Sequence, residues 1–326
     1  MIITIKDIAK ALNVSTATVS KAMHDYPDIG NKTKKRVKEY AEKIGYEPNI
    51  HASFLRTKKT KLIGIVVPNL NTDFYSELVA FLIVRITENG YLPIVLNSDE
   101  SEQVEGENLE RLMRQKVDGI FISLTKNTTR TNYLTKIVSS SSSLITFSNT
   151  SKVITCNKVV FNDKAIIKQV TEYLINKGNS RLVFIGKSLI SQNSINQFIG
   201  FREAHEEHKI SIDNQRIVIS KQGTFPEGYR IAKELFNSRE QIDGFISYND
   251  NLALGAMMFY KENGFDIPND IRFIGQGNSG IGTFYTPELS SIKHNLSLMA
   301  EKVMSLFIKE QAELKQKKIS PIKREE

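Results

Sequence analysis

Residues 4–23 read TIKDIAKALNVSTATVSKAM, and this stretch decides how the rest of the chain is interpreted. Apolar residues recur at the spacing of one helix face at Ile5, Ile8, Ala9 and Leu12. Thr4 can cap this helix, because Asp7 follows three residues later in the pattern of a capping box. Asn13 and Val14 then interrupt the pattern, so the first helix is expected to end there.

A second helix is predicted directly after Ser15, a common N-cap residue. Its inward side chains would be Val19, Ala22 and Met23. Its outward side chains are small, polar or basic: Thr16, Ala17, Ser20, Lys21 and His24. A face without large apolar groups can enter a DNA major groove, which is about 12 Å wide. Taken alone, the same face is also typical of a solvated surface.

A third helix and its charge complete the head of the chain. Its apolar face is Val37, Tyr40, Ala41 and Ile44, followed by Gly45 and Pro48 as stop signals. Its outer face carries Lys32, Lys34, Lys35, Arg36 and Lys38. Residues 1–61 hold 13 Lys and Arg against 6 Asp and Glu, which gives +7 of the net charge of +8 of the whole chain. A basic head on a nearly neutral body is typical of a nucleic-acid-binding module, although a small helical bundle could also dock a protein.

From Lys61 onward, short apolar runs alternate with helical segments. The runs expected to be strands are 62–67, 93–96, 119–123, 144–147, 159–161, 182–185, 216–219, 244–247 and 272–275. Helices are expected between them, including 74–88, 227–236, 251–263 and 296–311. Apolar strands that alternate with helices predict parallel α/β sheets. We expect the run 159–161 to begin a second series, so that the body has two lobes.

Composition narrows the class of protein further. No apolar run reaches the 18 or more residues of a membrane span, and the N-terminus lacks the order of a signal peptide. The chain has one cysteine, Cys156, which favours a reducing compartment, so a cytoplasmic protein without a membrane contact is expected.

Neither a cofactor, a metal nor a catalytic residue is expected. The glycine-rich stretch 275–282, GQGNSGIG, fits neither the dinucleotide fingerprint nor a phosphate-binding loop. His205 and His208 are three residues apart, but no set of Cys or carboxylates completes a metal site with them. Cys156 has no His nearby in the sequence, and no nucleophile motif occurs, so an enzyme is not expected.

The quoted stretch resembles the N-terminal signature of the LacI/GalR family of bacterial regulators. The resemblance continues through TKKRVKEYAEKIGYEPN (33–49) and LRTKKTKLIGIVVP (55–68), and more weakly along the whole chain. It implies that Thr16, Ala17 and Lys21 read base edges, while Ser15, Thr18, Ser20 and His24 lie near phosphates. It also implies a hinge helix from Asn49 to Arg56, with Leu55 as the wedge in the minor groove. The chain departs from the commonest family pattern at Lys21, His24 and Ser53, so the operator cannot be copied from relatives.

Effector-binding residues are expected at the carboxyl ends of the parallel strands. By resemblance, the effector-contact positions are Phe74, Tyr75, Asn193, Gln197, Phe225 and Asp250, and we add Asn278 as a partner for hydroxyl groups. Phe74 and Phe225 could equally be core residues, and Asp250 could be an N-cap. Gln197 stands where relatives often have an Arg, which favours a neutral sugar over an anion. Lys187 keeps a sugar phosphate open as an alternative.

Together these features predict a small all-α helix-turn-helix head and an α/β two-lobed body like the type I periplasmic-binding-protein fold. The expected division is a DNA-binding head (1–48), a hinge helix and linker (49–60), an N-terminal lobe (61–160 plus 294–318) and a C-terminal lobe (161–293). Relatives usually end with a further strand after the last helix, whereas here a charged stretch follows instead. If the third crossover between the lobes is thereby lost, we expect a less stable C-terminal lobe. The function expected is a homodimeric repressor of pseudo-palindromic operator DNA, switched by a small effector. The rival readings are a sugar-binding transport protein and an enzyme.

Overall fold

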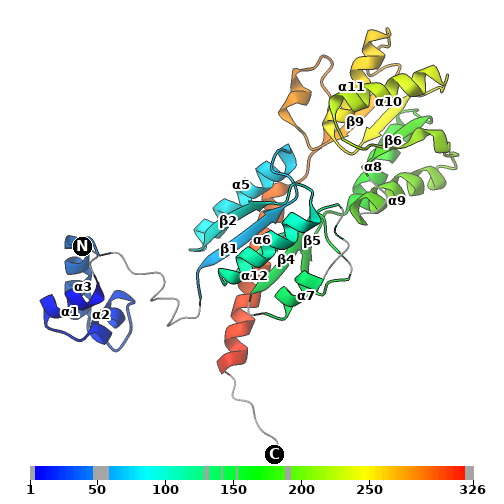
Figure 1. The fold of residues 1–326 in the computed structure, drawn as a ribbon. Coiled ribbons are helices and arrows are strands. Elements are labelled where there is room, and N and C mark those ends of the chain that lie inside the picture. Colours follow the sequence, from blue (N-terminus) through cyan, green and yellow to red (C-terminus); the bar gives the residue numbers. More distant parts are fainter. Residues whose placement is uncertain are drawn as a thin grey trace, which may run out of the picture. The chain divides into compact units, whose positions relative to one another are not determined.

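The computed structural model describes residues 4–46, 59–126, 128, 132–140, 142–151, 153–187 and 192–319, with side chains as far as residue 314. Internal contacts divide the chain into two units, Met1–Thr60 and Lys61–Glu326. Each unit is described by itself, and Figure 1 shows the elements of both along the chain.

Within residues 4–46 of the first unit, three short helices bury one face of each against the others: α1 (Ile5–Leu12), α2 (Thr16–Met23) and α3 (Asn31–Lys43). Their shared core is Ile8, Ala9, Leu12, Val19, Ala22, Val37 and Ala41. Asn13 has a φ of +51° directly after α1, which turns the chain toward α2. The amide of Thr4 donates to the Asp7 carboxylate at 2.8 Å, and Ser15 Oγ accepts from the amide of Thr18 at 2.9 Å. The three helices and the first two caps predicted from the sequence are thus confirmed.

The second unit begins with a parallel five-stranded sheet in the order β2-β1-β3-β4-β5. Its strands are β1 (Leu62–Val67), β2 (Leu92–Asn97), β3 (Gly119–Ile122), β4 (Ser143–Phe147) and β5 (Asn157–Val159). The register places Ile63 beside Pro93 of β2 and Gly119 of β3. Because every strand of a parallel sheet points the same way, the carboxyl ends of these strands share one edge.

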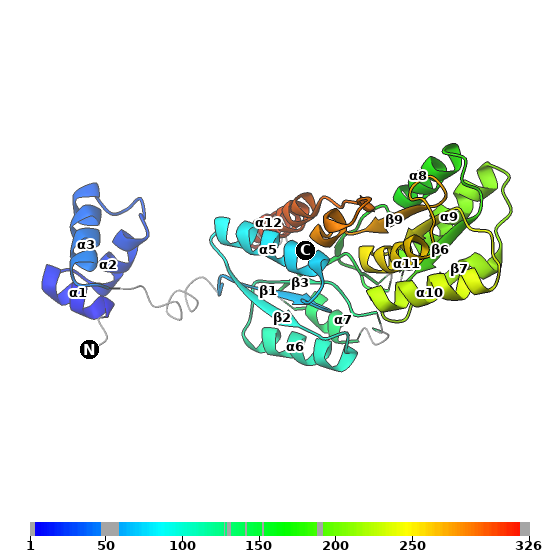
Figure 2. The same ribbon diagram turned by 90° about the horizontal axis from the view of Figure 1, so that it is seen from above.

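Two pairs of helices cover the sheet of this first lobe: α5 (Asp73–Glu88), α6 (Glu102–Arg114), α7 (Asn132–Val138) and α12 (Leu296–Ile319). Figure 2 shows the sheet between α5 and α12 on one side and α6 and α7 on the other. The ring of Phe307 in α12 meets those of Tyr91 and Phe121 at centroid distances of 5.1 and 5.6 Å. Gly119 leaves room for the Phe307 ring, since a Cβ there would lie 2.6 Å from it.

The second lobe has its own parallel sheet in the order β10-β9-β8-β6-β7. Its strands are β6 (Leu182–Gly186), β7 (Ile217–Ile219), β8 (Gly244–Ser247), β9 (Arg272–Gln276) and β10 (Ser290–Ile292). Its helices are α8 (Asp163–Asn176), α9 (Gln192–Glu207), α10 (Phe225–Asn237) and α11 (Asp250–Glu262), with short 3-10 turns at Asn214–Arg216 and Gly280–Phe284. Helices α8 and α9 pack on one face and α10 and α11 on the other. A side chain at Gly200 would strike the backbone of Lys164, so this glycine lets α8 and α9 approach closely.

The chain passes between the lobes twice within the described residues, between β5 and α8 and between β10 and α12. The strand predicted at 159–161 was assigned to the wrong lobe. The run 159–161 does not begin the second series; the strand is Asn157–Val159, and it pairs with β4 as the last strand of the first sheet. The last helix is also longer than the predicted 296–311, because it continues through the charged stretch to Ile319.

Candidate functional site

The outward face of α2 is the candidate nucleic-acid interface. Thr16, Ala17, Lys21 and His24 are exposed, while Thr18 and Ser20 are half-buried. Ser15 is exposed and fixes the start of the helix through its bond to the Thr18 amide and a second contact with the Thr18 hydroxyl at 2.9 Å. The helix therefore presents small polar groups at its first turn, where a recognition helix meets base edges. Asn49 and Leu55 lie outside the described residues, so their roles remain predictions.

Two ion pairs join the segment between α2 and α3 to these helices. Lys21 pairs with Asp28, and Lys38 pairs with Asp25 at 2.7 Å. The hydrogen bond with Lys21 lowers the pKa of Asp28, and the bond with Lys38 lowers the pKa of Asp25. All four side chains are largely exposed, so each pair contributes little to stability and can exchange for a phosphate. Lys21 is thus held on the outward face without being buried there.

The second candidate site lies at the carboxyl ends of the two sheets, where contacts join the lobes. Lys187, which follows β6, pairs with Glu100 of the first lobe at 3.4 Å between Nζ and Oε1. Asn193 of α9 donates from Nδ2 to the carbonyl oxygen of Ser148 at 2.9 Å. Both contacts join segments that follow strands of opposite lobes, so the carboxyl edges face each other, as in a ligand cleft.

On the first-lobe side, Phe74 and Tyr75 begin α5. The Tyr75 hydroxyl lies 2.9 Å from Ser123 Oγ, and burial raises the pKa of Tyr75 to about 12. The Phe74 ring meets the Tyr75 ring edge-on at 5.0 Å and the His294 ring at 6.2 Å. Tyr75 therefore serves as a neutral hydroxyl donor or acceptor at this edge, and Phe74 supplies an apolar surface.

On the second-lobe side, Gln197 lies in a chain of hydrogen bonds. Its Nε2 donates to Oε1 of Gln276 at 3.2 Å, and Gln276 Nε2 lies 2.6 Å from His294 Nε2. His294 in turn stacks on Phe161 at 4.2 Å between ring centroids. Sequence reasoning missed Gln276, Phe161 and His294 as site residues. Gln276 was detectable, because it directly follows the predicted strand 272–275 and so lies at the carboxyl end, where ligand-binding residues are expected.

Asp250 and Asn278 lie together at one turn. Asp250 Oδ1 accepts from Ser291 Oγ at 2.5 Å, and its Oδ2 accepts from the Ser279 amide at 2.6 Å. The Asn278 amide also donates to Ser291 Oγ, at 2.9 Å. Both oxygens of the buried Asp250 carboxylate thus hold the turn that follows β9. A direct effector contact of Asp250 stays a prediction, and the expected N-cap role falls to Asn249, whose Oδ1 accepts from the Leu252 amide at 2.9 Å.

Phe225 is half-buried at the start of α10 and packs against the core of the second lobe, 6.4 Å from the Tyr285 ring. A small cavity of about 90 Å³ brings Phe74 and Asn278 together with Glu77, Gly277, Lys293, His294 and Leu296. Of the seven predicted effector residues, the structure thus places Phe74 and Asn278 in one cavity. Gln197 and Asn193 lie on α9. Gln197 bonds to Gln276 of the second lobe, and Asn193 bonds to Ser148 of the first lobe.

Two buried carboxylates hold loops at the cleft edges. Glu227 accepts hydrogen bonds from Ser220 Oγ at 2.7 Å and from the amides of 221–223 at 2.8 Å each. Burial alone would raise the pKa of Glu227, but these four bonds outweigh it and lower the pKa to about 2. Glu105 accepts from the Thr125 amide at 2.7 Å and the Tyr133 hydroxyl at 2.8 Å, while burial raises its pKa. Both carboxylates are used internally, so they fix loop shape.

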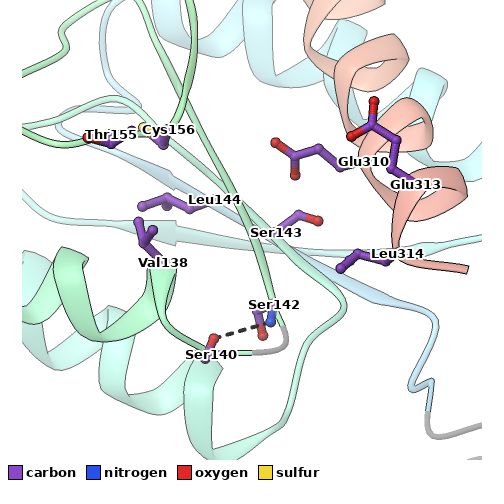
Figure 3. A pocket seen from close by; sticks show the side chains of 10 residues that line it. All are labelled: Val138, Ser140, Ser142, Ser143, Leu144, Thr155, Cys156, Glu310, Glu313 and Leu314. Carbon is purple, nitrogen blue, oxygen red and sulfur yellow. Dashed lines mark hydrogen bonds between the residues drawn. The ribbon is translucent and has the colours of Figure 1, made fainter. Parts of the chain in front are cut away.

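A larger cavity of about 230 Å³ lies elsewhere on the first lobe, near the amino ends of β4 and β5 and the end of α12 (Figure 3). Its lining is Val138, Ser140, Ser142, Ser143, Leu144, Thr155, Cys156, Glu310, Glu313 and Leu314. Because the strands begin here, it lies at the opposite edge of the sheet from the effector cleft.

Two features were searched for over the described part of the chain. No group of three or more His, Cys, Asp or Glu there is placed to hold a metal ion. None of the helices described is both long and apolar enough to cross a bilayer.

Comparison with known proteins agrees with this architecture. Residues 60–323 match the profile of periplasmic binding proteins and the sugar binding domain of the LacI family, and residues 4–49 match that of bacterial regulatory proteins of the lacI family. The chain belongs to the LacI family. It is a DNA-binding transcriptional regulator, in which a helix-turn-helix head precedes a two-lobed effector domain.

Similar proteins include other members of this family. Catabolite control protein A of Staphylococcus xylosus is 27% identical over 293 residues, which cover 90% of this chain and 87% of that protein. The regulator MalR of Streptococcus pneumoniae is 30% identical over 277 residues, covering 82% of each. The Lac repressor dimer bound to operator and the anti-inducer ONPF superposes with a TM-score of 0.83 at 20% identity, over 96% of this chain and 93% of that one. The CelR–cellobiose complex gives 0.68 at 20% identity, over 95% and 93%.

Proposed function

We propose that this LacI-family regulator is a homodimeric, cytoplasmic repressor whose two heads bind a pseudo-palindromic operator. The observation that carries this proposal is the exposed face of α2, which is small and polar at its first turn and carries Lys21 beyond it. In this proposal residues 1–48 bind DNA, 49–60 link, and 61–160 with 294–318 and 161–293 form the two lobes. Thr16, Ala17 and Lys21 read bases, and Ser15, Thr18, Ser20 and His24 contact phosphates.

Lys21 and Lys38 give a matched test of base reading. Both are exposed lysines paired with an Asp of the same segment, but only Lys21 lies on α2. On a site selected from random DNA by the unaltered protein, Lys21→Ala should cost about 1–3 kcal/mol and cost little on random DNA. Lys38→Ala should weaken binding to both DNAs alike. Fluorescence-anisotropy titrations measure the four affinities, and equal losses for Lys21→Ala on both DNAs would contradict the base-reading role.

Exposed apolar side chains support a dimer. Ile83 and Val84 of α5 are 36% and 50% exposed, and Leu92 at the start of β2 is 61% exposed. In the second lobe, Ile281 and Phe284 are 51% and 86% exposed. Exposed apolar side chains on each lobe can be covered by a second copy of the chain, which removes their apolar surface from water. The structural neighbour bound to operator is itself a dimer.

The effector proposed for the cleft is a neutral, hydroxyl-rich molecule, a sugar in preference to a sugar phosphate. Lys187 and Lys293 are cations that could receive a phosphate, but Glu100 pairs with Lys187 across the lobes and Glu77 lines the same cavity as Lys293. Gln197 and Gln276 offer amides without charge, and Phe74 and Phe161 offer apolar faces for the C–H side of a sugar ring. The sugar-binding description of the matched profile and the cellobiose complex of a structural neighbour agree with this class.

Calorimetry with panels of neutral sugars, sugar phosphates and purines tests the effector class. We expect binding only among the neutral sugars, together with a change in DNA affinity. Tight binding of an anionic or purine ligand alone would contradict the proposal. Glu100→Gln is the informative variant, because it frees Lys187: affinity for sugar phosphates should rise while affinity for neutral sugars changes little.

A further inference from the structure

The lysine on the outward face of α2 has a carboxylate as its partner. Lys21 lies near the end of α2, and its ammonium group forms an ion pair and a hydrogen bond with Asp28, in the segment between α2 and α3. The two side chains are 46% and 50% exposed, so both face solvent. Their hydrogen bond raises the pKa of Lys21 and lowers that of Asp28, so the pair stays charged at neutral pH. A DNA group that approaches Lys21 therefore approaches Asp28 as well.

The second carboxylate of this segment has other partners. Both oxygens of Asp25 accept hydrogen bonds from Lys38 Nζ of α3 at 2.7 Å, and Lys34 Nζ donates to the Asp25 carbonyl oxygen at 3.2 Å. The positive charge of Lys34 acts on both carboxylates. The head thus has two exposed lysine–aspartate pairs in one segment, and they differ in the helix that carries the lysine.

The pairing with Asp28 limits what the Lys21 ammonium group can do, but it does not use the group up. A lysine ammonium has three N–H donors, and the bond to Asp28 engages one of them. Two donors remain, which is enough for the O6 and N7 acceptors of guanine in the major groove. A lysine on its own is a point charge on a flexible stem, so it can swing between bases and backbone. An acceptor at its tip restricts the directions in which the remaining donors point.

The negative charge of Asp28 also affects phosphates and bases unequally. A phosphate carries a full negative charge, so it is repelled by Asp28 when both contact the same ammonium group. A base edge carries only partial charges, and the repulsion is smaller because Coulomb energies scale with the product of the charges. Phosphate contacts give affinity for any DNA, whereas base contacts give specificity. Asp28 thus disfavours the contact that is independent of sequence more than the contact that reads it.

We propose that Asp28 is a specificity-determining residue of the head, which directs Lys21 toward a base edge and away from phosphates. This inference rests on the proposed base-reading role of Lys21. Without the carboxylate, Lys21 would act as one more phosphate-binding cation on DNA of any sequence. Asp28 therefore lowers the affinity of the head for random DNA and raises its discrimination between sites.

The test compares Asp28→Asn with the unaltered full chain on two duplexes of equal length, by fluorescence anisotropy. One duplex is the site that the unaltered protein selects from random DNA, and the other has a random sequence. Asn keeps the shape of the side chain and removes its charge. Gain of one phosphate contact should raise affinity for random DNA by about three- to tenfold near 100 mM salt, and steepen the slope of log affinity against log salt by about 0.9. Affinity for the selected site should rise less, so the ratio of the two affinities falls.

Asp25→Asn is the matched control, because it releases Lys38, which lies on α3. Both affinities should then change by the same factor, and their ratio should stay as in the unaltered protein. A second control starts from Lys21→Ala. In that background Asp28→Asn should leave the ratio unchanged, because the lysine through which Asp28 acts is absent.

Three outcomes would overturn the proposal: a ratio that Asp28→Asn leaves unchanged, an equal fall in Asp25→Asn, or a fall that persists without Lys21. Asp28→Ser also removes the carboxylate, so it decides the question if circular dichroism shows that the Asn variant does not fold. The proposed base reading fails separately. Equal losses on both DNAs in Lys21→Ala remove that role and the role of Asp28 with it, whereas a ratio lowered by Lys21→Ala but not by Asp28→Asn removes only the role of Asp28.

Discussion

Replacing Asp163 by Asn should stabilise the protein at pH 7.5. The buried carboxyl has a pKa of about 6 instead of its usual 3.8, so its ionised form is disfavoured in the folded state. A difference of about two pH units corresponds to about 3 kcal/mol. Asn removes this cost but also the favourable interaction of a charge with the first turn of α8, about 0.3–1 kcal/mol. The expected net gain in the free energy of unfolding is about 2 kcal/mol.

The stability gained by Asp163→Asn depends on pH within a defined window. A carboxyl whose pKa is raised on folding favours the folded state fully below 3.8, and this advantage is lost as the pH rises through about 6. The variant should therefore gain over the original at pH 7.5 and match it near pH 4. Urea unfolding followed by circular dichroism suits this chain, which has no tryptophan. At an m-value of about 3 kcal/mol/M, the gain moves the midpoint by roughly 0.7 M.

Asp243→Asn is the control, because this buried Asp has partners. Its carboxylate accepts from the amides of Ser180 and Arg181 at 3.1 and 2.9 Å and pairs with Arg181 Nε at 3.2 Å. Removing its charge should lower stability at pH 7.5. The reasoning about Asp163 is wrong if Asp163→Asn is neutral or destabilising at pH 7.5, or if its effect is the same at both pH values.

Four further outcomes are expected. Operator affinity should fall by about 10³–10⁵ between 50 and 200 mM salt for roughly 6–10 phosphate contacts, and a flat response in anisotropy titrations would exclude the DNA interface. Glu227→Gln should lose up to about 3 kcal/mol in urea unfolding at pH 7, because the carboxyl with a pKa lowered to about 2 contributes stability above 4.5 that is lost as pH falls through 2; equal losses at pH 7 and pH 2 would contradict this. Phe284→Asp should shift sedimentation toward the monomer, whereas an unchanged dimer would place the interface elsewhere. Asp250→Ala should abolish the response of DNA affinity to effector while leaving DNA binding intact, since it releases the turn after β9; a retained response would remove Asp250 from the switch.

Local features of the fold were predictable because their causes are local. The Thr4–Asp7 box and the Ser15 cap involve residues three apart, so the sequence itself carries their geometry. The apolar runs likewise predict most strands. The assignment of 157–159 failed because a three-residue strand has too little periodicity, and its membership of the first sheet is set by pairing with β4.

The site was less predictable, because its contacts join distant segments. Gln197 and Gln276 are bonded although 79 positions separate them, and Lys187 meets Glu100 across 87 positions. Position at the end of a strand marked Lys187, but nothing local marked Glu100 as its partner. Asp250 shows a further difficulty, since a carboxylate at the start of α11 can hold the turn after the neighbouring strand β9 as readily as it can hold a ligand.

The path of the chain between the lobes also sets the order in which they can be completed during synthesis. The second lobe is one continuous stretch, whereas the first lobe needs α12 from the far end of the chain to cover the face that contains Phe121 and Phe147. At about 5–20 residues per second, the ribosome needs roughly 7–30 s to travel from Phe147 to Leu296. Throughout that interval the part of this face that α12 covers is exposed on the nascent chain. Aggregation during translation should therefore begin at the first lobe, even though that lobe is the first to emerge.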